Sequence, residues 1–486
     1  MEPTIAIWKD CKRLLTDNQP ITCDRLQSFA NINVHVGKNS MFIPQFKSVI
    51  CAVSDYFVSL QKQAQSNHPT MNLIKQLTIS LTAALLPACV QSQRHEILNE
   101  RIASLQVVPG DNWLSPLPIV ELNGATPILI AFDDLTHDYH RYAYRLEHCE
   151  ADWTASEGLF ESDFVDGFAK GNVIEDLSLS MNTNVLYTHY RLQIPNERCR
   201  IKRSGNYRLT VYDENNGDEI MFRACFMVVE PQMSVAMKVT SNTDIDLNHQ
   251  HQQVAMDVGF GSLNVVDPAR EIKTVVMQNG RWDDARINAK PQYVRADGLT
   301  WDHDRSLIFN GGNEYRKFET LDVNHPTMGI ESINWDGTMY HAYVWTDEPR
   351  PNYVYDEDAD GAFYIRNSDN IENDYASEYL MIHFRLKAPR QKGDVYLNGT
   401  WTNHQFAPSF QMHYDDVKQC YEGRVMLKQG YYSYQYLVVK ADGTVGPVST
   451  EGNFYQTENQ YQALVYYRGA GERTDRLVGF GQVSKR

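Results

Sequence analysis

The sequence lacks the short motifs on which many enzyme families depend. It has no G-x-S-x-G, no H-E-x-x-H, no P-loop and no complete G-x-G-x-x-G, so no hydrolase elbow, zinc protease site or nucleotide loop can be assigned. Cysteine is also scarce, with 8 in 486 residues and no CxxC pair that would suggest a zinc or redox site. We therefore expect neither catalysis nor a cofactor, metal or small-molecule substrate.

Positive charge and long apolar runs are the other shortages. The chain has 45 Lys and Arg against 61 Asp and Glu, a formal net charge of −16. An acidic surface repels phosphate backbones, so nucleic acid is not an expected partner. After residue 93 no run of 18 apolar residues occurs, so we do not expect an integral membrane protein.

One internal segment has the form of a secretory signal. In "MNLIKQLTISLTAALLPACVQSQ", Met71–Gln93, Lys75 provides the basic start, Leu77–Leu86 the apolar core, and Pro87 ends the core before small residues. The apolar core is about ten residues long, too short to span a bilayer, which needs roughly 20. A buried helix of a globular domain is the alternative interpretation.

The position of this segment predicts how the chain is processed. Residues 1–70 are interpreted as a spurious upstream extension and residues 71–92 as the signal peptide. Two modes of cleavage remain open: release before Gln93, or acylation of Cys89 within a lipoprotein-like box. Soluble export is favoured, because proline is unusual just before the small residue of such a box. Both modes place the mature chain beyond the cytoplasmic membrane.

Period-two alternation dominates the rest of the sequence. "TPILIAFDDL", "YAYRLEH", "THYRLQIP" and "NYRLTVYDE" place apolar or aromatic residues at every second position between Gly, Asn, Asp and Pro clusters. This predicts an all-β fold of three consecutive antiparallel, immunoglobulin-like or early-set sandwiches. Helical turns are expected only near Glu157 to Phe168. Prolines after strand-like runs place the domains at 96–230, 231–388 and 389–470, followed by a tail at 471–486.

Two short motifs contain residues that could bind a metal or act as nucleophiles, and each motif also has a purely structural interpretation. "DEDADG" spaces Asp356, Asp358 and Asp360 like a calcium loop, but Asn367 stands where a bidentate carboxylate is needed, so a solvated acidic hairpin tip is favoured. "HCEADW" begins with His148 and Cys149, and neighbouring residues on a strand point to opposite faces, so a nucleophilic pair is not expected. Trp153, Cys149 and their neighbours are expected in the core. A disulfide among Cys149, Cys199 and Cys225 remains open.

The last predicted domain has a tryptophan that could serve a different function. "GDVYLNGTWTNHQF" is similar to the early-set sandwich of glycogen-binding modules, in which a turn such as Asn398-Gly399 is followed by Trp401 and Asn403. That resemblance implies stacking of aromatic rings on sugars. Only Trp401 matches clearly, so a core position for this ring is favoured.

The order of several strings along the chain resembles one family. "FDDL", "YAYRLEHCEADW", "NTNVLYTHYRLQIPNE", "SGNYRLTVYDE", "VYLNGTWTN", "KQGYYSYQYLVV" and "EGNFYQTENQYQALVYYR" look like the plug protein of the type IX secretion system of Bacteroidota. The resemblance runs from about Arg101 to Arg468. It implies a periplasmic, non-enzymatic protein that closes the periplasmic opening of the outer-membrane translocon barrel when no cargo is engaged.

An exported carbohydrate-binding protein using the last domain is the alternative. The resemblance identifies no residues that contact the barrel. The sequence also predicts no catalytic, cofactor-binding or metal-binding residue.

Overall fold

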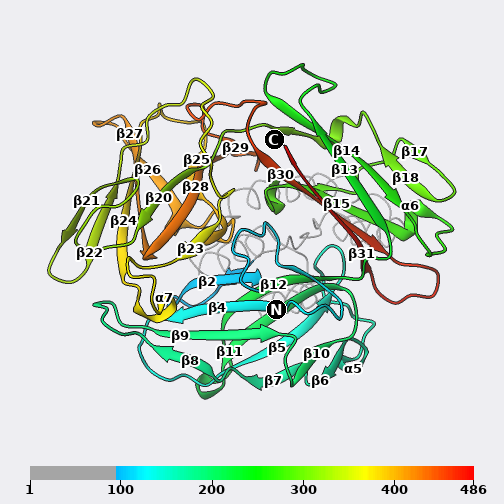
Figure 1. The fold of residues 1–486 in the computed structure, drawn as a ribbon, viewed down its shortest axis with the longest axis horizontal. Coiled ribbons are helices and arrows are strands. Elements are labelled where there is room, and N and C mark those ends of the chain that lie inside the picture. Colours follow the sequence, from blue (N-terminus) through cyan, green and yellow to red (C-terminus); the bar gives the residue numbers. More distant parts are fainter. Residues whose placement is uncertain (1–94, 486) are drawn as a thin grey trace, which may run out of the picture. The chain divides into compact units, whose positions relative to one another are not determined.

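The structure, a computed structural model, describes residues 95–485. The predicted signal segment, the upstream residues and Cys89 lie outside the described residues, as does Arg486. In the described range, strands are joined by loops and short helical turns (Figure 1), which confirms the all-β fold class. No helix in this range is long and apolar enough to cross a membrane.

Two sheets enclose one apolar core and form what we call the first sandwich. Its strands pair antiparallel, except that the short β3 runs parallel to β12. One sheet contains β1 (Glu96–Ile97), β12 (Glu219–Val229), β11 (Gly205–Asp213), β5 (Tyr142–Cys149), β7 (Lys170–Val173) and β3 (Ile119–Glu121). The other contains β2 (Ile102–Pro109), β4 (Ile128–Asp134), β9 (Thr188–Ile194) and β8 (Asp176–Leu179), and a separate pair is formed by β6 (Val165–Gly167) and β10 (Cys199–Ile201).

Strands from two distant parts of the chain enclose a second core. We call this pair of sheets the middle sandwich. The last two strands of the chain pair with β15, so this sandwich is discontinuous in sequence. One sheet contains β13 (Ser234–Thr240), β14 (His251–Gly259), β18 (Gly298–Trp301), β17 (Tyr293–Val294) and β19 (Ile308–Asn310). The other contains β16 (Arg286–Ile287), β15 (Ile272–Gln278), β30 (Asn459–Tyr467) and β31 (Arg476–Lys485).

The remaining strands form one ten-stranded sheet around a third core. Its inward residues include Phe318, Phe384 and Tyr432. Its main path is β20 (Arg316–Thr320), β28 (Gly430–Val439), β25 (Asp394–Asn398), β26 (Gln411–Asp415), β27 (Cys420–Lys428), β24 (Tyr379–Leu386), β22 (Tyr340–Val344) and β21 (Ile330–Trp335). The short strands β23 (Phe363–Ile365) and β29 (Val445–Pro447) also pair with β28.

Helical segments in the described range are one turn long. The expected turn near Glu157 to Phe168 is present as α5. The α-helical turns are α5 (Glu161–Phe164), α6 (Pro268–Glu271) and α7 (Asn373–Ala376). The 3-10 turns are η1 (Glu214–Asn216), η2 (Trp282–Asp284), η3 (Arg305–Leu307), η4 (Thr400–Thr402) and η5 (Pro408–Phe410).

Strand pairing divides the chain differently from the predicted domain limits. The limit near residue 230 falls in the short link between β12 and β13. The limit at 388/389 instead falls inside the ten-stranded sheet, because β24 before it pairs with β27 after it. The predicted tail, 471–486, contains β31, which pairs with β30 along its length. A proline after a strand marks the end of that strand, and here it does not mark the end of the sheet.

Candidate functional site

A buried ion pair joins the first sandwich to the ten-stranded sheet. Lys428 Nζ at the end of β27 lies 2.6 Å from Asp133 Oδ2 on β4, and both side chains are almost fully buried. The same carboxylate accepts hydrogen bonds from Tyr379 Oη at 2.6 Å and, at its other oxygen, contacts His189 Nδ1 at 2.7 Å. Although burial opposes ionisation, Lys428 and His189 lower the pKa of Asp133. Fully partnered buried charges of this kind favour one relative orientation of the two surfaces.

A fourth apolar cluster joins the first sandwich to the middle sandwich. Strand β12 is buried on both faces: Phe226 and its alternate neighbours fill the first core, while Cys225, Met227 and Val229 face outward. These residues pack with outward residues of β15 and β30, such as Met277 and Tyr466. Each face of β12 packs against a different apolar cluster. Both faces of the strand are therefore apolar.

Trp153 lies in this cluster, as the sequence predicts for a core residue. Its side chain is 1% exposed, and its ring meets that of Trp282 from the middle sandwich edge to face, with centroids 5.7 Å apart. Its backbone has φ +65°, in the left-handed region that bulky residues rarely adopt. Trp153 thus combines an uncommon backbone conformation with a ring contact across the interface.

His148 and Cys149 point to opposite faces of β5. His148 lies in the first sandwich, where Ser156 Oγ and the carbonyl of Ser204 are its hydrogen-bond partners, and burial lowers its pKa to about 4. Cys149 faces the fourth cluster, and burial raises the pKa of its thiol to about 12. A protonated thiol turned away from a neutral imidazole is not an activated nucleophile. The four cysteines of the described range are buried, and none of the disulfides considered is formed.

The "DEDADG" carboxylates separate toward different protein donors. Asp356 pairs with Lys317 Nζ at 2.6 Å, while Asp358 accepts the backbone N–H groups of Tyr315 and Asp360. Asp360 accepts a hydrogen bond of 2.8 Å from Gln460 of β30. Of the three aspartates only Asp356 fits the expected solvated tip, because Asp358 accepts backbone hydrogen bonds and Asp360 contacts the middle sandwich. Within residues 95–485 no three His, Cys, Asp or Glu side chains are grouped as a metal site requires.

A polar cleft of about 200 Å³ lies beside this loop, and half of its lining residues are Asp or Glu. Burial, with repulsion from Asp360 and Glu314, raises the pKa of Asp358 to about 8. Burial also raises the pKa of Asp360 to about 6. Asp358 therefore keeps its proton at neutral pH, at the contact between the ten-stranded sheet and the middle sandwich.

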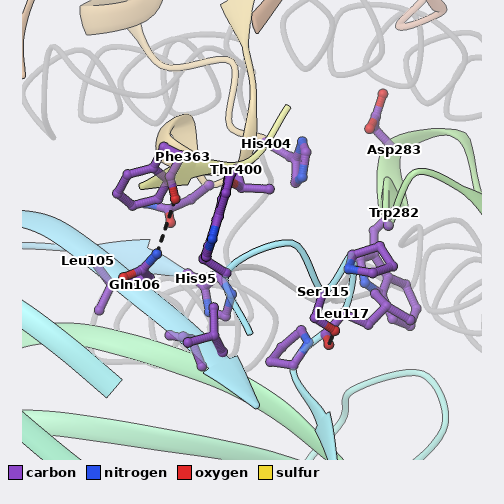
Figure 2. Close-up of a pocket in the computed structure, with 17 residues that line it drawn as sticks. His95, Leu105, Gln106, Ser115, Leu117, Trp282, Asp283, Phe363, Thr400 and His404 are labelled. Atoms are coloured by element: carbon purple, nitrogen blue, oxygen red, sulfur yellow. Dashed lines mark hydrogen bonds between the residues drawn. The ribbon is translucent and has the colours of Figure 1, made fainter. Parts of the chain in front are cut away.

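A small cavity lies where all three parts meet. Figure 2 shows His95 and Gln106 from the first sandwich, Trp282 from the middle sandwich, and Phe363 and His404 from the ten-stranded sheet around it. Its volume is about 60 Å³. Ligand pockets are usually ~300–1,000 Å³, so this space suits a few water molecules and not a substrate.

Some polar groups around the cavity are hydrogen-bonded within the protein, whereas Trp282 Nε1 and His404 Nδ1 are buried without a hydrogen-bond partner in the described range. Gln106 donates to the carbonyl of Phe363 at 3.3 Å, and His95 Nδ1 accepts the N–H of Cys225 at 3.1 Å. Burial lowers the pKa of both His95 and His404 to about 4, so neither imidazole is charged at neutral pH. The cavity is thus a packing junction between the three parts.

Trp401 occupies the core position that the sequence favours. It is 8% exposed, its Nε1 donates to the carbonyl of Ser433 at 2.9 Å, and its ring lies beside Phe384, Phe410 and Tyr432. A buried ring face cannot stack on a sugar. Trp401 therefore belongs to the third core.

Comparison with known proteins finds a family model and a solved structure that are similar to this chain. Residues 102–230, which cover the first sandwich, match the family model described as "Type 9 secretion system plug protein 1st domain". The crystal structure of a hypothetical protein from Parabacteroides merdae ATCC 43184 is 39% identical, with a TM-score of 0.78, over 81% of this chain and 99% of that chain. No curated protein matches the sequence.

A Streptomyces avermitilis α-L-rhamnosidase complexed with L-rhamnose aligns at 10% identity with a TM-score of 0.15 over 79% of this chain and 40% of that chain, which supports no structural inference. The P. merdae structure, in contrast, is similar over nearly its whole length, and the family match covers the sandwich that contains Asp133 and Trp153. These findings agree with the resemblance in the sequence. The chain belongs to the type IX secretion system plug protein family.

Proposed function

We propose that this protein is a non-enzymatic periplasmic plug, which closes the periplasmic opening of the type IX outer-membrane translocon barrel when no cargo is engaged. The observation that carries the proposal is the match of residues 102–230 to the first plug domain. A pore that passes folded proteins is wide, so an idle pore needs a closure to preserve the permeability barrier.

The interlocked architecture supports this role physically. A body that closes a pore must keep its shape under contact, and one that is already ordered loses little conformational entropy on docking. Here the ion pair of Lys428 with Asp133 and the contact of Trp153 with Trp282 join the first sandwich to the other two parts.

A deletion strain tests the proposal. Loss of the plug should leave idle barrels open, so large polar antibiotics such as vancomycin should inhibit the strain at lower concentrations while cargo secretion continues. Removal of the barrel gene as well should restore resistance. A deletion strain with a normal barrier and no cargo secretion would instead make the protein a working part of transport.

A further inference from the structure

One face of the ten-stranded sheet is accessible to solvent, and its amino-acid composition differs from that of the acidic chain as a whole. Strands β22, β24 and β27 are neighbours, and alternation turns every second residue of each away from the core. In register, Tyr343 stands opposite His383, and His383 opposite Arg424. We call this the open sheet face; its residues are His341, Tyr343, Met381, His383, Arg385, Glu422, Arg424 and Met426, together with Trp345 directly after β22.

The composition of this face is typical of protein interfaces. Tyr, Trp, Met and Arg are enriched at the centres of protein–protein contacts, whereas Asp, Glu and Lys are depleted. The open sheet face has six residues of the enriched types and one carboxylate, in a chain whose formal net charge is −16. That carboxylate, Glu422, is already engaged by Arg385 at 3.1 Å and Lys418 at 2.9 Å.

The open sheet face continues an interface that already exists in the molecule. Lys428 and Tyr379 stand opposite each other in the next row of the same strands, and there the first sandwich covers the sheet. Beyond that row the covering ends: Trp345 is 59% exposed, and Arg424 is exposed. In Figure 1, β21 and β22 lie at the left edge, on the side of the ten-stranded sheet away from β30 and β31.

Side chains of this face are held in place before any partner arrives. The rings of Tyr343 and His383 stack with centroids 4.4 Å apart. His341 Nδ1 lies 2.8 Å from His383 Nε2, and its other ring nitrogen contacts Asp336 at 2.9 Å. Ordered aromatic side chains reduce the entropic cost of binding.

Charge indicates the chemistry of the occupant. Burial, with the neighbouring His341 and Arg424, lowers the pKa of His383, so this imidazole is neutral at pH 7. Within residues 95–485 no carboxylate lies within salt-bridge distance of Arg424. A guanidinium that stands opposite the His383 ring and two positions from Met426 on the same face suits a carboxylate that is presented together with apolar surface.

We propose that the open sheet face docks a protein partner that presents a carboxylate to Arg424 and apolar side chains to Tyr343, Trp345 and the two methionines. Under the function proposed above, on which this inference rests, that partner is the translocon. Arg424 then lies in a middle row of the face, between the row of Arg385 and Glu422 and the row of Met381 and Met426.

Charge reversal at Arg424 tests the inference. The full chain is bound to detergent-solubilised translocon as wild type, as Arg424→Glu, and as Arg145→Glu, an exposed strand arginine of the first sandwich that serves as matched control. We expect Arg424→Glu to weaken binding ~10-fold or more and Arg145→Glu to leave it unchanged, because charges at the centre of an interface matter most. Thermal unfolding should be the same for all three proteins, since both arginines are exposed.

The outcomes separate this inference from the proposed function. Equal binding of wild type and Arg424→Glu overturns the docking face while the plug function stands. Failure of the wild type to bind any translocon overturns the plug function, and the docking face falls with it. A wild-type dimer that Arg424→Glu converts to monomer, seen by light scattering, shows that the face joins two copies and also overturns the inference.

Discussion

Lys428 and Asp133 are 295 positions apart in the sequence, yet Lys428 Nζ donates a hydrogen bond of 2.6 Å to the Asp133 carboxylate in a site from which water is excluded. The ammonium group also lies 4.1 Å from the centroid of the Tyr187 ring. A charge buried in this way is stable only with its partner in place. The pair therefore makes the docking of the first sandwich on the ten-stranded sheet sensitive to single substitutions.

Removal of one member of this pair should be costly. Lys428→Met leaves Asp133 buried without its cation, and we expect a loss of roughly 3–5 kcal/mol in the free energy of unfolding. Urea denaturation measures it. Lys418→Met, which removes an exposed lysine paired with Glu422 at the surface, is the matched control and should change the midpoint little. Equal effects of the two substitutions would contradict a special role for the buried pair.

The acidic cleft predicts a pH-dependent stability. Burial and neighbouring carboxylates raise the pKa of Asp358 to about 8, so the folded protein keeps a proton that the unfolded chain releases near pH 4. The folded state binds more protons in this range, so the contribution of this group to stability is complete below about pH 4 and is lost as pH rises through about 8.

Asp358→Asn, which cannot ionise, should therefore raise the midpoint of thermal unfolding at pH 8 and lose this advantage at pH 4. Circular dichroism at intervals across the range measures both. Asp356→Asn, at an exposed position of the same loop, is the control. A gain that is constant with pH would show that removal of the proton from Asp358 is not its cause.

Truncation of Trp153 should loosen the contact between the first and middle sandwiches. Trp153→Ala removes a large ring from a fully buried site, and we expect a cost of roughly 3–5 kcal/mol. Amide exchange in β15 should accelerate, because the ring contacts Trp282 just after that strand. Trp335→Ala, at a ring that is 46% exposed, should leave exchange in β15 unchanged. In cells, Trp153→Ala should mimic the deletion strain.

Trp401 separates the plug from the carbohydrate-binding alternative. Its buried ring predicts no heat in calorimetry with soluble α-glucans, and a loss of stability in Trp401→Ala. Clear binding by the wild type that Trp401→Ala abolishes, with the fold intact by circular dichroism, would favour the carbohydrate-binding function.

Much of the local structure could be predicted from the sequence, because alternation of apolar residues reports directly on strands. The strings around Tyr142, Tyr207 and Tyr432 are strands in the structure. The local pattern also predicts core positions for Trp153 and Trp401, and both rings are buried in the structure. These conclusions depend only on residues within a few positions of each other.

Pairing between distant strands could not be predicted in the same way. Nothing in "IKTVVMQ" of β15 specifies that its neighbour begins at Asn459, since backbone hydrogen bonds carry no sequence signal. Lys428 was missed for a similar reason: in "VMLKQGYY" it has the pattern of an exposed lysine near a turn, and its partner Asp133 lies in another part of the fold. The open sheet face likewise needs the order of β22, β24 and β27, which are not consecutive in the chain.

The return of β30 and β31 to the middle sandwich makes the ten-stranded sheet an insertion within another domain. The two chain segments that connect this sheet to the middle sandwich lie side by side. Asn313 Nδ2 donates a hydrogen bond to the carbonyl of Glu451, and the Gly312 N–H donates one to Asn453 Oδ1. A chain that emerges from its N-terminus can complete the first sandwich and the inserted sheet while β15 still has an open edge. Closure of the middle sandwich, and with it the packing of Leu464 and Tyr466 against the first sandwich, therefore requires β30 and β31. A chain truncated before Asn459 would lack β30 and β31, so it could complete neither the middle sandwich nor its contact with the first sandwich.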